Sequence, residues 1–233
     1  MARHAVAEDH RLTTTHCNAD APRWLRRLAP LLALLLACEE LPRTYSSAGP
    51  AQLLFADRFD GPELGPSWKT TGPGARLEGG ELVTEGLRNH PLWLTLPLPD
   101  NVRVEFDARA ATDEGDIKVE LAGDGKSFAR SASYTATGYV VIFGGWNNTT
   151  SAIVRRDEHG GDRKTTQSLK VEAGKRYHFA ITRRDGAIRW ELDGQEVLAY
   201  DDPEPLTGPA QRHFAFGGWE ARVAFDNLEV FAL

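Results

Sequence analysis

Apolar and polar residues alternate with a period of two along much of the chain beyond residue 52. In segment 102–110 every second residue is apolar, and segments 176–182 and 188–193 repeat the alternation. Successive side chains of a strand point to opposite faces, so each segment has one apolar and one polar face. The pattern predicts strands that bury one face, with inward residues Val102, Val104, Phe106, Ala108, Ala110, Tyr177, Phe179, Ile181, Ile188, Trp190 and Leu192.

Turn residues separate these segments at short intervals. Gly79-Gly80, Asp185-Gly186 and Asp193-Gly194 stand between predicted strands, and such pairs favour tight hairpins because both residues tolerate a positive φ. The whole pattern predicts about twelve short strands, and no segment makes a convincing amphipathic helix. Many short strands in one domain are typical of an all-β fold in which two antiparallel sheets pack face to face.

The first 37 residues have the pattern of a secretory signal and not of a domain. Arg23, Arg26 and Arg27 precede an apolar run, Leu28 to Ala37, that ends immediately before Cys38. The run has about half the length that a membrane-spanning helix needs. The end of this run, with a small residue directly before Cys38, resembles the lipobox of bacterial lipoproteins. The resemblance implies that Cys38 is lipidated and becomes the mature N-terminus. An ordinary signal with a chance cysteine, or a buried helix, are the alternatives.

The residues around this signal complete the predicted organisation. The stretch from Met1 to Pro22 is long for the start of a signal and holds the one methionine of the chain, which favours a true start codon further on. Residues 38–52 are polar and rich in Pro, Ser and Gly, which predicts a tether. Glu39-Glu40 has no Asp at the second position, which in enterobacterial-type sorting permits the outer membrane. We therefore expect a lipid-anchored protein of the cell envelope, on the outer membrane or periplasmic face, with one folded domain at 53–233.

The net charge and the positions of the cysteines exclude several classes of function. The chain carries a net charge of −6, and removal of residues 1–37 takes away five arginines and three acidic residues, which changes it to −8. This acidity argues against nucleic acid as a partner. Cys17 lies in the segment to be removed and Cys38 is the lipid site. Cysteine nucleophiles, thiol zinc sites and an internal disulfide are therefore excluded from the mature domain.

Scattered strand motifs resemble those of concanavalin A-like lectin and glucanase domains, the laminin-G-like jelly rolls. Segment 54–60, followed by Trp68, looks like their opening strand, and segment 225–230 is similar to their closing strand. The strand, Asp-Gly turn and strand between Arg189 and Tyr200 resemble a hairpin late in such chains. The resemblance covers nearly all of residues 53–233 and implies a two-sheet jelly-roll sandwich that recognises or cleaves glycans on its concave sheet. Fold alone does not establish that function.

The strongest candidate for a site is a motif that occurs twice. Phe-Gly-Gly-Trp stands at 143–146, before two asparagines, and again at 216–219, before a glutamate. Glycine inside a strand lowers its stability, so paired glycines suggest a place where a ligand or another backbone comes close. If the two strands are neighbours, two indoles flank a glycine-floored trough that suits a sugar ring. The expected ligand-binding residues are Trp146, Asn147, Asn148, Arg155, Trp219 and Glu220. The alternative is that both tryptophans pack in the core and the glycines form bulges.

An enzyme of the same fold would need two carboxylates across one glycosidic bond. Segment 114–120 resembles the acidic strand of family-16 glycoside hydrolases, but the step from Glu114 to Glu120 spans about 20 Å on a regular strand, too far for one bond. Lys118 also stands where a neutral or acidic residue is expected. We interpret these charges as a solvated strand face. The charged segment from Arg155 to Lys164, which includes Glu158 and His159, is either an exposed loop or a rim that contacts a polar ligand.

The resemblance also implies a structural calcium ion near the first and last strands, for which Asp57 and Asp226 stand at suitable positions. Local bonding of Asp226 at a bulge with Asn227 is the alternative. Apart from such an ion, no cofactor is expected. Three functions remain open: a lipid-anchored carbohydrate-binding protein that stacks sugars on tryptophan, a glycoside hydrolase or polysaccharide lyase built from dispersed residues of the same sheet, and a structural envelope module that binds proteins.

Overall fold

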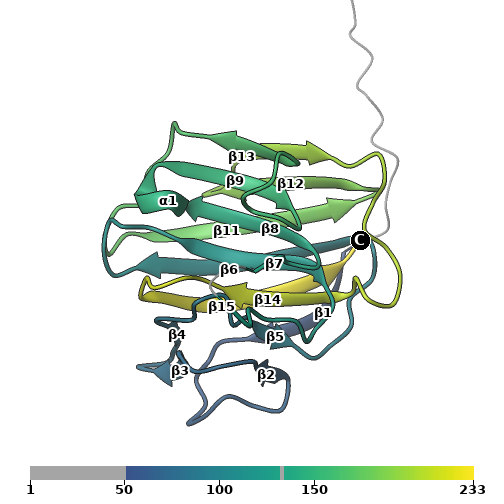
Figure 1. Ribbon diagram of the computed structural model, residues 1–233. Coiled ribbons are helices and arrows are strands. Elements are labelled where there is room, and N and C mark those ends of the chain that lie inside the picture. Colours follow the sequence, from purple (N-terminus) through teal and green to yellow (C-terminus); the bar gives the residue numbers. More distant parts are fainter. Residues whose placement is uncertain (1–50, 132–133) are drawn as a thin grey trace, which may run out of the picture. The chain divides into compact units, whose positions relative to one another are not determined.

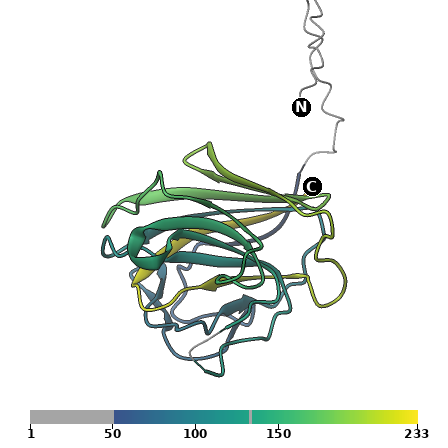
Figure 2. The same ribbon diagram turned by 45° about the horizontal axis from the view of Figure 1, so that its top comes forward.

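The computed structural model describes residues 51–131 and 134–233, which form two antiparallel sheets packed face to face (Figures 1 and 2). The expected signal at 1–37, Cys38 and nearly all of the expected tether lie outside the described residues. The first strand begins at Gln52, one residue before the predicted domain boundary. Within the described residues, no helix is long and apolar enough to cross a membrane.

The first sheet has eight strands, and two of them, β4 and β1, share one side of β15. Strand β15 lies beside β6 on one side, and on its other side it pairs with β4 near its start and with β1 near its end. In spatial order the strands are β13 (Gln195–Asp201), β12 (Ala187–Leu192), β11 (Arg176–Arg184), β6 (Val102–Ala110), β15 (Val223–Ala232), β4 (Glu81–Thr84) and β3 (Ala75–Glu78), with β1 (Gln52–Asp57) beside β15.

The second sheet has seven strands. One four-residue helix, α1 (Gly145–Asn148), follows its third strand in spatial order. The strands are β10 (Arg163–Thr166), β9 (Thr150–Arg155), β8 (Tyr139–Gly144), β7 (Ile117–Gly123), β14 (His213–Gly217), β5 (Leu92–Leu94) and β2 (Trp68–Thr70).

The period-two pattern is confirmed where it was clearest. Along β6 the apolar residues are buried and the polar residues between them are half-buried. Strands β11, β12 and β13 form consecutive hairpins through the predicted Asp-Gly turns. At the second of these turns both residues have positive φ, 52° at Asp193 and 79° at Gly194, which is the backbone geometry that this pair tolerates.

The opening and closing segments of the domain pair with each other, as the family resemblance implies. Phe55 of β1 lies opposite Val230 of β15, and Asp57 lies opposite Leu228. Since β15 also pairs with β6 along most of its length, the two ends of the domain are held in the centre of the first sheet. The fold is therefore the two-sheet antiparallel jelly-roll sandwich that the sequence predicted.

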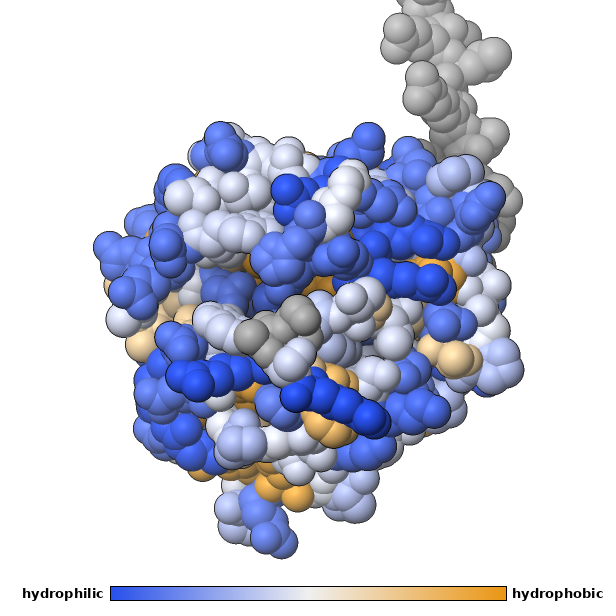
Figure 3. All heavy atoms as spheres, in the orientation of Figure 1, coloured by the Kyte–Doolittle hydropathy of each residue, from blue (hydrophilic) through white to orange (hydrophobic). Residues whose placement is uncertain are grey.

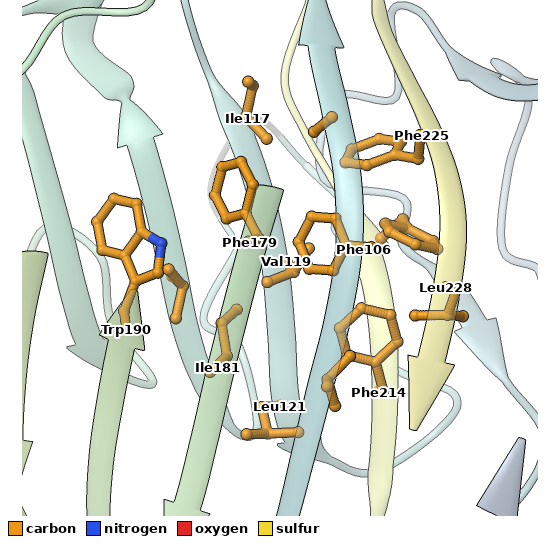
Figure 4. Close-up of a cluster of buried hydrophobic side chains, with 14 of the residues drawn as sticks. Phe106, Ile117, Val119, Leu121, Phe179, Ile181, Trp190, Phe214, Phe225 and Leu228 are labelled. Carbon is orange, nitrogen blue, oxygen red and sulfur yellow. The ribbon is translucent and has the colours of Figure 1, made fainter. Parts of the chain in front are cut away.

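Aromatic side chains fill the space between the sheets (Figure 4). Phe106 of the first sheet stacks on Phe179 with ring centroids 4.9 Å apart, and Phe216 of the second sheet contacts Phe225 of the first at 4.3 Å. All four side chains are almost completely buried. Burial of such large apolar surfaces provides the main driving force for the fold, which fits a segment 53–233 that contains no cysteine.

The outer face of the second sheet is covered over much of its area. Every residue of β7 is buried, although only alternate residues point into the sandwich. Of the β7 side chains that point outward, Glu120 accepts hydrogen bonds from the N–H groups of Thr137 and Gly138. On the neighbouring strand β5, Trp93 donates a hydrogen bond from Nε1 to the Ser127 carbonyl (3.1 Å). A second small apolar cluster on this face joins Ala136 to Val140 and Ile142. The open part of this sheet is therefore confined to its ends.

Candidate functional site

A cavity of about 440 Å³ lies at the end of the second sheet where β7 begins and β8 and β14 end. Trp146 and Trp219 both line it, and each keeps 37% of its surface exposed. The alternative that both tryptophans pack in the core is therefore wrong. Figure 3 shows this face of the molecule, on which hydrophilic side chains dominate. The cavity also contacts Glu114, Asp116, Lys118, Asn147, Glu158 and Glu220.

The two Phe-Gly-Gly-Trp strands are not neighbours, which corrects the expected floor of the site. Strand β7 lies between β8 and β14 and pairs with both. The floor therefore carries the side chains of Asp116 and Lys118 and is not bare glycine backbone. Among the paired glycines, Gly144 allows a close approach to another backbone segment instead of forming the floor. A Cβ atom on Gly115 would lie 2.2 Å from the Gly144 carbonyl oxygen, so the start of β7 and the end of β8 approach closely at these two residues.

A left-handed turn places Trp146 on one wall of the cavity. Strand β8 ends at Gly144 (φ 70°), and Trp146, Asn147 and Asn148 follow with φ values of 52°, 55° and 57°. Three successive non-glycine residues with positive φ are strained and need outside support. The strand alternation that would put Gly144 and Trp146 on one face is therefore broken, because the chain leaves the strand between them.

Asn148 supplies the support for this turn. Its Nδ2 group donates to the carbonyls of Asp113 (2.7 Å) and Val171 (2.8 Å), and its Oδ1 atom accepts from the Val171 N–H (2.8 Å). The side chain is buried and does not line the cavity. Asn148, expected to contact a ligand, is thus a positioning residue for Trp146. Its neighbour Asn147 is exposed and lines the cavity.

Backbone hydrogen bonds hold Trp219 on the opposite wall. Its N–H donates to Asp116 Oδ2 (2.9 Å), and its carbonyl accepts from the Arg88 N–H (2.8 Å). The indole is thus tied to strand β7 and to the segment that precedes β5. Glu220 follows at the rim and pairs with the Arg88 guanidinium at 2.8 Å, where both side chains are more than half exposed. Such an exposed pair contributes little stability.

A buried lysine forms the centre of the floor. Lys118 Nζ lies 2.9 Å from Glu158 Oε2, 3.9 Å from Asp116 Oδ1 and 3.4 Å from Asn89 Oδ1. Burial lowers the pKa of Lys118, but the carboxylates of Asp116 and Glu158 outweigh burial and hold that pKa above its ordinary value. The ammonium group thus stays charged, and it ties the segment after β9 to strand β7.

The charges of segment 114–120 do not form the solvated face that we expected. Lys118 and Glu120 are both buried. Asn89 and Glu158 contact Lys118, and residues 134–138 cover Glu120. Glu120 accepts hydrogen bonds from the Tyr134 hydroxyl (3.1 Å), the Thr137 N–H (2.9 Å) and the Gly138 N–H (2.7 Å). Burial nevertheless raises the pKa of Glu120 from 4.5 to about 7. Glu120 does not line the cavity between the tryptophans.

Arg155 lies away from this cavity. Its Nε donates to Asp202 Oδ2 (2.8 Å), and its terminal nitrogen donates to the Glu204 carbonyl (3.0 Å). It borders a separate cavity of about 300 Å³. Arg155 was expected to contact the ligand, but it is the last residue of strand β9, which carries it to the far end of the sheet.

The two aspartates expected to hold calcium do not fit that ion. Asp57 accepts from Trp68 Nε1 (2.8 Å) and from the Phe59 N–H (2.8 Å). Asp226 faces the Arg176 guanidinium at 3.3 Å and accepts from the Asn227 N–H (2.8 Å), which is the local bonding that the alternative described. Calcium needs six to eight oxygen ligands, and the described residues contain no group of three or more His, Cys, Asp or Glu side chains placed to hold a metal.

The sequence pointed to some of the other residues that line the cavity, but not to the roles that the structure gives them. Glu158 and His159 belong to the charged segment for which a rim was one alternative, and Glu158 now lines the floor while the His159 ring lies 6.1 Å from the Trp146 ring. Asp116 and Lys118 belong to segment 114–120, for which we predicted a strand face exposed to solvent. No sequence pattern pointed to Asn89 as a lining residue. Its position depends on contacts with β7 and with Gly218, which are far away in the chain.

The fold is that of a two-sheet jelly-roll domain of the concanavalin A-like type. Residues 102–230, more than half of the chain, match the family described as farnesoic acid O-methyl transferase. The chain belongs to that family.

Solved structures show a related fold, and one curated protein is similar in sequence. The laminarinase from Rhodothermus marinus is 17% identical, with a TM-score of 0.54 over 78% of this chain and 98% of that one. The carbohydrate recognition domain of Emp47p is 14% identical, with a TM-score of 0.55 over 78% and 97%. An extracellular exo-α-L-arabinofuranosidase of Streptomyces chartreusis is 24% identical over 160 residues, which are 68% of this chain but 18% of that enzyme. The chain thus spans less than a fifth of that curated relative.

The close approach at Gly115 leads to a prediction about the geometry of the site. Gly115 and Gly79 both have positive φ, 80° and 65°, but a Cβ on Gly79 meets no atom within 4 Å. Both Gly115→Ala and Gly79→Ala carry the backbone strain, and only the first adds a clash with Gly144. We expect Gly115→Ala to lower the free energy of unfolding by about 2 kcal/mol more than Gly79→Ala, measured by urea denaturation. Equal losses would contradict the close approach.

The pKa of Glu120 predicts a pH dependence of stability. A carboxyl group whose pKa is raised on folding binds more protons in the folded state, so its contribution to stability is lost as the pH rises from 4.5 to about 7. We expect the free energy of unfolding to fall by about 3 kcal/mol across this window. Glu120→Gln keeps an acceptor and removes the titration, so the difference between the two proteins isolates the group. A pH-independent difference would show that Glu120 stays ionised.

Proposed function

We propose that this protein is a lipid-anchored carbohydrate-binding protein that holds its ligand between Trp146 and Trp219. The observation that carries the proposal is that two partly exposed indoles line one cavity. An indole ring offers an apolar face that matches the C–H face of a pyranose ring. The similarity of the fold to a laminarinase and to a carbohydrate recognition domain supports sugars as the ligand class.

Polar groups around the indoles suit the hydroxyl groups of a sugar. Asn147 and Glu220 are exposed at the rim, next to Trp146 and Trp219, and Glu114 lines the same cavity. Amide and carboxylate groups provide acceptors and donors in fixed positions, which is the usual composition of a small-molecule site. Stacking then supplies contact area, and these groups select the orientation of the ring.

The arrangement of acids favours binding over cleavage. Glu120 has a pKa of about 7, which suits a general acid, but its oxygens face Tyr134, Thr137 and Gly138 under the segment that covers the sheet. It borders only a small cavity of about 20 Å³. A group enclosed in this way does not reach a glycosidic oxygen held between the tryptophans.

A glycoside hydrolase or polysaccharide lyase is the second candidate, and one contact favours it. Asp116 and Glu158 both face Lys118 Nζ, so the two carboxylate oxygens that contact it are at most about 7 Å apart, close to the separation in inverting glycosidases. The ammonium group, however, lies between the two carboxylates, where the bond to be cleaved would have to lie. Release of reducing ends from a polysaccharide panel, lost in Asp116→Asn, would establish this candidate in place of the first.

Replacement of either indole tests the proposed binding. On a glycan array we expect wild-type protein to bind one class of sugar, and we expect Trp146→Ala and Trp219→Ala each to weaken that binding at least about tenfold, as loss of one stacking contact implies. Isothermal titration calorimetry with the selected sugar measures the change.

Leu53→Ala is the matched control, because Leu53 is 51% exposed on β1 of the other sheet. It should leave binding unchanged. Full binding by both tryptophan variants would contradict the proposed site. A wild-type protein that binds no glycan would favour the third possibility, a structural envelope module that contacts other proteins.

Anchoring is tested separately from sugar binding. The lipobox-like sequence before Cys38 supports a lipid anchor, so Cys38→Ser should move the protein from the membrane fraction to the soluble fraction of the cells. Cys17→Ser is the control, because Cys17 lies within the segment that we expect to be removed. Membrane association that survives Cys38→Ser would contradict lipidation at this residue.

A further inference from the structure

The cavity between the tryptophans carries more negative than positive charge. Glu114, Asp116, Glu158 and Glu220 line it with carboxylates, whereas Lys118 is its one lysine among the described residues and no arginine there lines it. Lys118 is shared by Asp116 and Glu158, so its charge is already balanced by the protein. An anionic ligand would therefore meet repulsion, and among the described residues that line the cavity no lysine or arginine is left unpaired to offset it.

Two of the carboxylates face the opening. Glu114 is exposed, and it forms no ion pair with any residue in 51–131 or 134–233. Glu220 is paired with Arg88, but both side chains are more than half exposed, so solvent screens this pair and leaves the carboxylate accessible. A positively charged group on the ligand would find acceptors on both sides of the entrance.

The indole rings also attract cations. The guanidinium of Arg163 already lies over the Trp146 ring, 5.3 Å from its centroid. Aromatic faces attract cations through their electron-rich π-systems, and tryptophan does so most strongly. The rings that would stack on a sugar therefore favour one that carries a positive charge.

We propose, on the basis of the carbohydrate-binding function above, that the ligand is an amino sugar with a free, protonated amine. An oligosaccharide of non-acetylated hexosamine units combines a pyranose face for Trp146 and Trp219 with an ammonium group for the carboxylates. The net charge of −8 expected for the mature chain acts in the same direction, because it raises the local concentration of cationic ligands.

The experiment compares glucosamine oligomers with N-acetylglucosamine oligomers of the same length and linkage. Titration calorimetry is done on the full chain at a pH at which the free amine is protonated. We expect the amine-bearing oligomer to bind at least about tenfold more tightly at low salt, and we expect this advantage to shrink as salt screens the charges. Oligomers of a uronic acid should bind more weakly than either.

Charge variants separate a specific site from general attraction. Glu114→Gln should weaken binding of the glucosamine oligomer several-fold more than it weakens binding of the N-acetylated oligomer, because only the first loses an ion pair. Glu196→Gln makes the same charge change at an exposed residue of β13 in the first sheet, and it should affect neither. Equal effects of these two variants would overturn the proposal, as would full binding of glucosamine oligomers by Trp219→Ala.

The outcomes for the two proposals are distinct. Equal or tighter binding of the N-acetylated oligomer, with loss of that binding in Trp219→Ala, would overturn the preference for a cation and support the carbohydrate site. Tighter binding of a uronic acid would also overturn the preference. The absence of binding to every sugar on the array would overturn both proposals.

Discussion

Asp116 joins three of the segments that line the cavity. Its N–H donates to the Gly144 carbonyl (3.0 Å), at the start of the turn that carries Trp146, and its Oδ2 accepts from the N–H of Trp219 (2.9 Å). Its other oxygen faces the buried ammonium of Lys118 at 3.9 Å. Asp116 itself has a φ of 68°, and aspartate is one of the few residues that tolerates this conformation. The positions of both indoles thus depend on Asp116, the residue immediately before strand β7.

The covering of the outer sheet face decides where a ligand can bind. Glu120, Trp93 and the small apolar cluster around Val140 take up the middle of the face and are buried by residues 124–131 and 134–138. A site in the middle of the sheet would need these contacts to be broken. The open cavity lies instead at the ends of the strands, where the turn after β8 and the segment after β14 project beyond the sheet. Loops on a rigid scaffold commonly carry function for this reason.

Family membership and function rest on different parts of this molecule. The match at 102–230 begins with β6 and reaches β15, so it covers most strands of the sandwich and reflects the core that they share. A common sandwich hosts many activities, and the chemistry depends on the site. Here the site combines two indoles with a surplus of carboxylates, and these residues, more than the fold, support the ligand class that we propose.

Several features were predictable because they depend on neighbours in the sequence. The alternation along β6 and the turn at Asp193-Gly194 each follow from local backbone geometry. The repeated Phe-Gly-Gly-Trp motif contains the two tryptophans that line one cavity, and its Gly144 lies where the backbone approaches another segment. The assignment of Asn148 to a ligand was wrong, because its amide is used by the carbonyls of Asp113 and Val171, which lie 35 and 23 residues away in the chain.

The sequence by itself thus determined the class of fold, the hairpins and the two tryptophans worth testing, since period-two burial and turn geometry are local properties. Only the tertiary structure decided that β7 lies between β8 and β14 and that Lys118 and Glu120 are buried. It also decided that Glu158 reaches the floor of the cavity. Strand order and loop covering result from contacts between distant segments, and no local pattern of residues encodes those contacts.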